Sequence, residues 1–571
     1  MASTGNEAQR SPEPGAPGQT MAGSEVRRVW LSFGILALAA VGSVARLTPP
    51  APSPATIPPT EVSAERALEH VNVIARERHP AGSPAHAAVR AYLVEELRKL
   101  GLTVEVQSGV LTGSPGRGVG EGQAVENILA RLPGTAPTKA LMLASHYDSA
   151  DESFGASDAG AGVAAILETV RAVRAGPPLT NDLLVLITDA EERGLCGAIV
   201  FVREHPRVQD VGLVANFEAR GSCGPSIMFE TSDGNGRLVE GFAAAASHPC
   251  TTSLAYEVYR RLPNDTDLTV FKAAGLPGLN FAFIGGLEDY HAPTDDVAHL
   301  DRRTLEHHCR NAHSVVRAFG NADLRDLVAP NLVYFDLLGA FVVRYPGGLA
   351  LPLALAAAAA WAVAAWRARR EGRLALGKAG LGLLAALLAI ALAAAAVWGA
   401  WRLALWLHAP NGFRATIDFS ARPALFYGVA LLVLGTFTLA LEFPLRRLGV
   451  WNVALGGGFV WVGLALGTAG WFEGASYLFT WPLFFAVAGA ACDPRVPSGG
   501  RVAFAIPAIA LFAPTLWLFF LAMTLHAAPV LAAVAAVGLL PAVPVLEALP
   551  ARHRVILGCV AAAAGALAML A

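Results

Sequence analysis

The sequence has little net charge and few cysteines for a chain of 571 residues. Its formal net charge at pH 7 is only −2, and no basic tract interleaves with aromatic residues, so we expect no nucleic-acid partner. The six cysteines form no CxxC pair, which argues against a structural zinc knuckle and leaves disulfides open. Hydrophobic residues make up 54% of the chain, and the mean hydropathy is +0.46. This composition exceeds that of soluble domains and predicts a membrane protein.

The first 59 residues contain three segments of different character. Residues 1–26 are rich in Ser, Gly, Pro and Glu without apolar periodicity, which predicts a disordered extension. Residues 27–46 begin with two arginines and continue as an uncharged apolar run, which is long enough for a transmembrane signal anchor. A cleaved signal peptide fits the same pattern, and either interpretation exports the chain that follows. Residues 47–59 read as a Pro-rich linker.

Residues 60–326 have the pattern of a folded domain. Buried-looking strands such as "ALMLASHYD" and "DLLVLITDA" alternate with helical stretches such as "AHAAVRAYLVEELRKLGL" and "AGVAAILETVRAV". This alternation predicts an α/β domain with a mostly parallel central sheet flanked by helices. Residues 327–346 are expected to connect this domain to the rest of the chain.

Residues 347–571 predict a transmembrane region of about eight helices. Basic residues collect in alternate loops, which places the α/β domain on the non-cytoplasmic side of a multi-pass protein. Acidic residues are scarce and lie near the span ends, so no chain of buried charges suggests an ion-coupled transporter. The expected spans are roughly 347–366, 379–401, 424–441, 448–472, 474–492, 502–525, 527–546 and 555–571.

Metal-binding side chains follow consecutive strands of the predicted sheet. Functional groups gather at the carboxyl edge of parallel strands, and imidazole mixed with carboxylate suits zinc. One carboxylate, best assigned to Asp158, would bridge two ions about 3.5–4 Å apart. Clustered acids are costly unless cations neutralise them, so we expect a metal centre. The candidate ligands are His146, Asp158, Glu192, Glu218 and His291.

Several motifs in this region resemble those of a known enzyme family. The motifs "HYDS", "GASDAGAGVAAILE", "DAEERGLCG", "NFEARG", "NDTDLTVF" and "YHAPTDD" occur in the order found in the aminopeptidase S and aminopeptidase Y family of di-zinc exopeptidases. The resemblance covers about 260 residues. With "VYFDLLGAFVVRYP" and the apolar half included, the chain is similar to the branch of vacuolar membrane proteases and endoplasmic reticulum metallopeptidases.

The resemblance implies a zinc exopeptidase fold and a role for each ligand. One zinc ion would be held by His146 and Glu218, the other by Glu192 and His291, with Asp158 bridging. Glu191 would be the general base that activates water for attack on a peptide carbonyl. The implied activity is removal of amino-terminal residues from peptides by a protein anchored in a lipid bilayer.

Three more side chains have weaker sequence support. Asp148 and Asp295 follow His146 and His291 by two and four residues, and are expected to orient the imidazoles. Tyr290 is expected to donate to the developing oxyanion, because it precedes His291.

Other interpretations of the same residues stay open. Glutaminyl cyclase resembles this fold but binds one zinc ion, and a receptor or assembly domain without catalysis is also possible. Manganese or cobalt could occupy the same ligands. Asp265 and Asp267 either shape the substrate cleft or cap a helix. The substrate-binding residues and the oligomeric state are not specified by the sequence.

Overall fold

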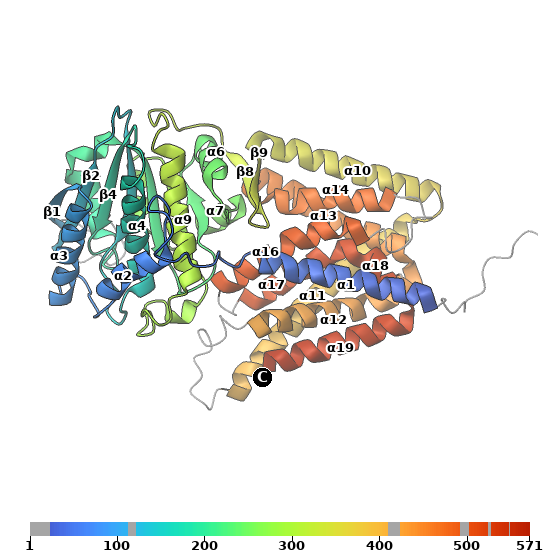
Figure 1. The fold of residues 1–571 in the computed structure, drawn as a ribbon. Helices are drawn as coiled ribbons and strands as arrows, with labels where there is room; N and C mark the ends of the chain where they lie inside the picture. The colour runs from blue at the N-terminus through green and yellow to red at the C-terminus, as the bar shows by residue number, and fades with distance from the viewer. Residues whose placement is uncertain are drawn as a thin grey trace, which may run out of the picture.

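The computed structural model describes residues 23–111, 122–408, 423–491, 502–523, 527–547 and 549–570. Two regions lie end to end, an α/β domain and a bundle of apolar helices (Figure 1). The expected disordered extension lies almost entirely outside the described residues, which begin in α1 (Gly23–Ala45). That helix packs in the bundle against α16 (Ile506–Ala522).

The α/β domain is built on a seven-stranded sheet with the order β1-β2-β4-β3-β5-β7-β6. The four neighbouring strands β4, β3, β5 and β7 run parallel, whereas β1, β2 and β6 add antiparallel pairs toward the edges. The predicted fold class, α/β with a mostly parallel central sheet, is confirmed. The strands are β1 (Thr103–Leu111), β2 (Gln123–Leu132), β3 (Ala140–His146), β4 (Asp182–Thr188), β5 (Val211–Ala219), β6 (Ile227–Thr231) and β7 (Gly278–Phe283).

Both faces of the sheet are covered, which explains why its central strands are apolar without alternation. In β3, Leu141 and Leu143 belong to one buried cluster, and Met142 and Ala144 belong to another. Successive side chains of a strand point to opposite faces, so each face of the sheet has its own core.

The covering helices begin where the sequence supplies a capping oxygen. The side chains of Ser63, Ser83 and Asp301 each accept a backbone N–H at the start of a helix, which satisfies a donor that has no partner inside the helix. The helices of the domain are α2 (Ala64–Ile74), α3 (Pro84–Lys99), α4 (Gly162–Arg174), α5 (Cys196–Glu204), α6 (Gly236–Ala245), α7 (Ser253–Tyr259), α8 (Asp267–Ala273) and α9 (Arg302–Phe319).

The apolar helical region, residues 347–570, contains six segments long and apolar enough to cross a membrane, among the residues that the structure describes. The expected spans at 474–492 and 502–525 contain the shorter helices α14 (Tyr477–Ala491) and α16. The expected anchor at 27–46 overlaps α1, whose apolar part is Trp30–Ala45. The count of eight spans therefore stays a prediction. The six segments are made by α10 (Ala350–Arg370), α11 (Leu376–His408), α12 (Pro423–Leu448), α13 (Val450–Trp471), α17 (Ala528–Leu539) with α18 (Val543–Glu547), and α19 (Ala551–Leu570).

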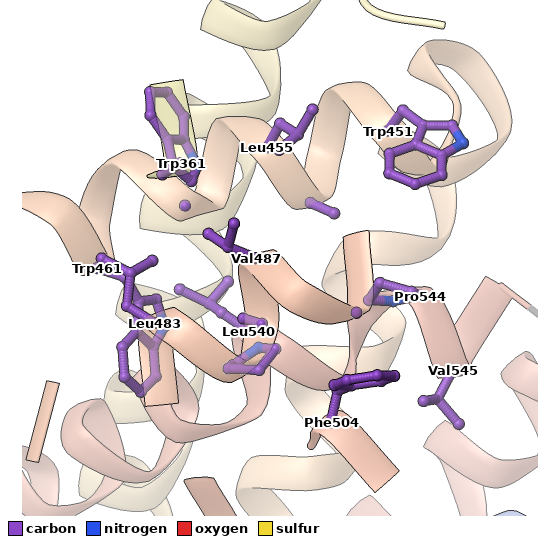
Figure 2. A pocket seen from close by; sticks show the side chains of 15 residues that line it. Trp361, Trp451, Leu455, Trp461, Leu483, Val487, Phe504, Leu540, Pro544 and Val545 are labelled. Atoms are coloured by element: carbon purple, nitrogen blue, oxygen red, sulfur yellow. The ribbon is translucent and has the colours of Figure 1, made fainter. Parts of the chain in front are cut away.

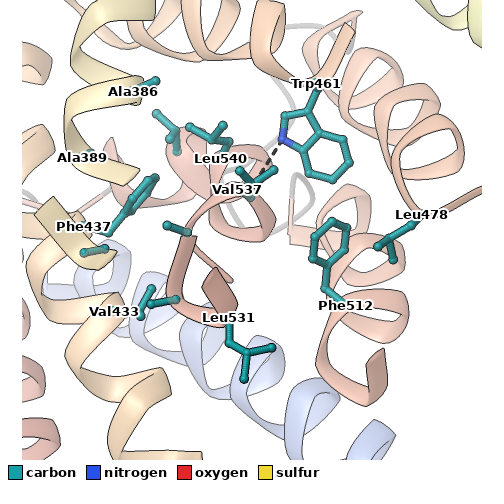
Figure 3. Packing of buried hydrophobic residues seen from close by; sticks show 14 of the residues in the cluster. Ala386, Ala389, Val433, Phe437, Trp461, Leu478, Phe512, Leu531, Val537 and Leu540 are labelled. Carbon is teal, nitrogen blue, oxygen red and sulfur yellow. Dashed lines mark hydrogen bonds between the residues drawn. The ribbon is translucent and has the colours of Figure 1, made fainter. Parts of the chain in front are cut away.

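The interior of the bundle is packed by aromatic and aliphatic side chains. Trp461 donates its ring N–H to the carbonyl of Val537 at 3.1 Å, and its ring centroid lies 5.4 Å from that of Phe512 (Figure 3). This hydrogen bond satisfies a polar group that would be costly in an apolar interior. A small cavity of about 80 Å³, lined mainly by apolar side chains such as Trp361, lies within the bundle (Figure 2).

The segment expected as a connector, residues 327–346, forms a hairpin of β8 (Leu332–Leu337) and β9 (Phe341–Pro346) between the two regions. The ring of Phe335 stacks on Tyr477 of α14 with centroids 4.3 Å apart. The Tyr477 hydroxyl also lies 2.6 Å from Oγ1 of Thr252, and Ser253 donates to the carbonyl of Gly474 at 2.7 Å. The α/β domain is thus joined to the bundle by direct contacts as well as by the chain.

Close packing of α12 against α19 yields a prediction. A Cβ atom at Gly435 would lie 2.3 Å from the backbone nitrogen of Ala562, so Gly435→Leu forces the two helices apart. We expect this variant to lower the melting temperature of the purified chain in detergent by several degrees, since overpacking costs about 1–3 kcal/mol. The matched control is Gly399→Leu, because a Cβ there meets nothing within 4 Å. Equal melting temperatures for both variants would contradict the packing described.

Candidate metal centre and cavity

The first half of the candidate site surrounds His146, the last residue of β3. Its side chain is almost fully buried, and Nδ1 donates a hydrogen bond to the carbonyl oxygen of Asp148 at 2.9 Å. This bond fixes the ring so that Nε2 faces two carboxylates. Nε2 lies 3.2 Å from Oδ1 of Asp158 and 3.5 Å from Oε2 of Glu218.

The second half of the site surrounds His291, in the loop after β7. Its Nε2 atom lies 3.2 Å from Oδ2 of Asp158 and 3.0 Å from Oε1 of Glu192. The two oxygens of Asp158 therefore face different imidazoles, one in each half. This is the arrangement that a carboxylate needs in order to bridge two metal ions.

The topology of the sheet explains why these residues meet. His146 ends β3 and Glu218 lies near the end of β5, while Glu192 follows β4 and His291 follows β7. All four strands are parallel and adjacent, so their carboxyl ends lie at one edge of the sheet. Asp158 reaches the same edge from the segment between β3 and α4.

The separations between these atoms fit a metal-binding site. Two ligand atoms bound 2.0–2.1 Å from a tetrahedral zinc ion are about 3.3 Å apart. The four pairs of ring nitrogen and carboxylate oxygen are separated by 3.0–3.5 Å. Three groups of three possible ligands result. Two of them share Asp158, namely His146, Asp158 and Glu218, and Asp158, Glu192 and His291. The third is His146, Glu191 and Glu192.

The electrostatics of the site also favour a cation. Burial and the neighbouring Asp158 raise the pKa of Glu192 to about 7. Burial raises the pKa of Glu191 well above its ordinary value. Burial acts in the same direction on Asp158, but hydrogen bonds from His146 and His291 hold the pKa of Asp158 below its usual range. Carboxylates gathered in this way repel one another, and divalent ions would neutralise them.

Asp148 has contacts beyond the one expected for it. A carboxylate oxygen lies 3.5 Å from Nδ1 of His146, near the ring that it was predicted to orient. The two carboxylate oxygens also accept hydrogen bonds from the backbone N–H groups of Glu191 and Glu192, at 3.0 and 3.2 Å. Asp148 therefore ties the turn after β4 to the end of β3.

Asp295 does not orient His291 as the sequence spacing predicted. Its carboxylate accepts hydrogen bonds from the Ser153 hydroxyl at 2.9 Å and from the backbone N–H of Ser157 at 2.7 Å. A longer contact of 3.4 Å reaches the N–H of Asp158. The prediction was wrong because a four-residue offset in a loop does not fix the direction of a side chain. The structure places Asp295 as a support for the segment that carries Asp158.

Glu191 and Tyr290 line a cavity of about 410 Å³ next to the two groups of ligands that share Asp158. The ring of Tyr290 stacks on His291, with centroids 3.8 Å apart. Burial and the nearby Asp158 raise the pKa of Tyr290, so its hydroxyl keeps its proton. Both side chains thus face the space that a substrate would occupy.

The structure separates the two aspartates of "NDTDLTVF". Asp265 lines the cavity, whereas Asp267 is buried in the first turn of α8 and accepts a hydrogen bond from the Thr188 hydroxyl. The cavity is also lined by side chains of α16, including Leu518 and Phe519, which the sequence did not suggest. More than 200 residues separate them from the metal ligands, and no local motif marks them.

Parts of this chain are similar in sequence to known proteins. Residues 127–316 match the model of peptidase family M28. The vacuolar membrane protease of Candida albicans (strain WO-1) is 32% identical over 271 residues, which cover 47% of this chain and 31% of that protein. The endoplasmic reticulum metallopeptidase 1 of Rattus norvegicus is 30% identical over 231 residues, which cover 39% of this chain and 26% of that protein. The matches therefore span about a third or less of these relatives' own length.

A solved structure of a zinc aminopeptidase from Bacillus subtilis also aligns with the chain. It has 15% sequence identity and a TM-score of 0.38, and the alignment covers 47% of this chain and 98% of that one.

The match to peptidase family M28 thus lies within the α/β domain and includes His146, Asp158, Glu192, Glu218 and His291. Beside this domain, the part of the chain that the structure describes has six helices long and apolar enough to cross a membrane.

Proposed function

We propose that the chain is a membrane-anchored di-zinc aminopeptidase. His146 and Glu218 would hold one ion and Glu192 and His291 the other, with Asp158 available to both. The observation that carries this proposal is the position of Asp158, whose two carboxylate oxygens lie 3.2 Å from two different imidazoles. A site for a single metal ion would not need one carboxylate placed between two imidazoles.

The side chains around the cavity supply the remaining chemistry. Zinc ions bound there would polarise the substrate carbonyl and lower the pKa of water. Glu191 takes a proton from the attacking water and delivers it to the departing amine, since its carboxyl group lines the cavity and its backbone is held by Asp148. The Tyr290 hydroxyl donates a hydrogen bond to the developing oxyanion and keeps its proton.

The ligand set favours this function over the alternatives left open by the sequence. A receptor domain without catalysis has no need of a buried carboxylate like Glu191 beside a full set of metal ligands. A glutaminyl cyclase that binds one zinc ion would not require both groups of ligands that share Asp158. Metal content distinguishes the two enzymes.

The test uses the full-length chain purified in detergent, with metal analysis and hydrolysis of aminoacyl amides. We expect two equivalents of zinc and measurable turnover. Glu191→Gln should lose about 10²–10⁴-fold in kcat, because general acid–base catalysis contributes that much, while it keeps its metal and its fold.

Glu240→Gln, on the exposed surface of α6, is the matched control and should retain full activity. Near-normal turnover in Glu191→Gln would contradict its role as the base. One equivalent of zinc in the unaltered chain would contradict the bridged pair.

We further propose that the peptidase domain faces the non-cytoplasmic side. The support is the collection of arginines in alternate loops of the helical region. A cysteine introduced at exposed Glu240 should react with a membrane-impermeant thiol reagent applied to intact cells or sealed organelles. The control is the chain without this change, which reports labelling of native cysteines. Reaction only after the membrane is opened would contradict this orientation.

A further inference from the structure

The cavity beside the metal ligands extends beyond the α/β domain. Its lining includes Asp158, Glu191 and Glu218 of the α/β domain. The same lining includes Leu518 and Phe519 of α16. The end of α16 reaches the α/β domain (Figure 1). One continuous space therefore joins the candidate metal centre to a helix of the bundle.

Much of the cavity lining is apolar. Phe229 and Ile284 of the α/β domain pack with Leu518 against the same buried cluster, and all three line the cavity. Val258 and Leu262 line it too. The volume of about 410 Å³ lies within the range of pockets that bind small ligands. The apolar lining suits a large hydrocarbon group, and the carboxylates beside the metal ligands suit a peptide bond.

Contacts between the two regions hold α16 in place. Leu518 and its neighbour Trp517 pack against a buried cluster of the α/β domain that contains Ile227 and Cys250. On the α7 side of the cavity, Thr252 caps that helix and bonds to the Tyr477 hydroxyl of α14. Two walls of the cavity therefore depend on helices of the apolar region.

We propose that α16 is a specificity-determining part of the active site, in which Leu518 and Phe519 contact the side chain of the substrate's first residue. This inference rests on the proposed aminopeptidase function. The preferred substrates are peptides whose first side chain is large and apolar, because such a side chain displaces water from this wall. The apolar helical region then contributes to substrate selection and also anchors the enzyme in the membrane.

The experiment compares two readouts in the full-length chain loaded with zinc. The first is the ratio of kcat/KM values for leucine amide and alanine amide. The second is the ratio of binding affinities for leucine hydroxamate and alanine hydroxamate, measured by calorimetry without turnover. The variants are Phe519→Ala, which enlarges the cavity, and Phe519→Trp, which narrows it. The control is Leu516→Ala: Leu516 and Phe519 both lie on α16 and pack against the bundle core, but only Phe519 of the two lines the cavity.

We expect the unaltered chain to prefer leucine over alanine in both readouts. Both Phe519 variants should change this preference by about tenfold or more, since fitting a hydrophobic pocket has effects of that size. Leu516→Ala should keep the preference of the unaltered chain. Unchanged ratios in both Phe519 variants would overturn the role of α16.

The two readouts separate this inference from the function on which it rests. Suppose that neither the unaltered chain nor any variant hydrolyses an amide, but the ratio of hydroxamate affinities still depends on Phe519. The aminopeptidase function then fails, and the binding role of α16 holds. If hydrolysis occurs and neither ratio depends on Phe519, the role of α16 fails and the aminopeptidase function holds.

Discussion

Mutual repulsion among buried carboxylates is the constraint on which the candidate site depends. Asp158 and Glu218 are buried at the carboxyl edge of the sheet, with Glu192 beside them. The imidazoles of His146 and His291 face this negative charge directly. Such a cluster is stable when cations complete it, and the shared position of Asp158 explains why two cations fit better than one.

The hydrogen bonds around the buried carboxylates position loops as well as the histidine ring. Asp148 fastens the turn that carries Glu191 and Glu192, and Asp295 fastens the segment that carries Asp158. Each carboxylate satisfies backbone N–H groups that would otherwise be buried without a partner. The geometry of the ligands therefore comes from hydrogen bonds to the backbone on both sides of the site.

The sequence predicted some parts of this structure well because their signals are local. The strand containing His146 is a short apolar run, and the parallel arrangement follows from its alternation with helices. The contact of Asp295 with Ser157 was not predictable, because it depends on the path of a loop. The wall made by Leu518 and Phe519 was not predictable either, because it depends on how two regions distant in sequence pack together.

The most direct test of the account is the distance between the two metal ions in the zinc-loaded chain, measured by X-ray absorption spectroscopy at the zinc edge. A pair bridged by Asp158 predicts zinc–zinc scattering at about 3.5–4 Å, which is lost or lengthened in Asp158→Asn. Zinc environments without a second metal within this distance would contradict the bridged centre on which the proposed function rests.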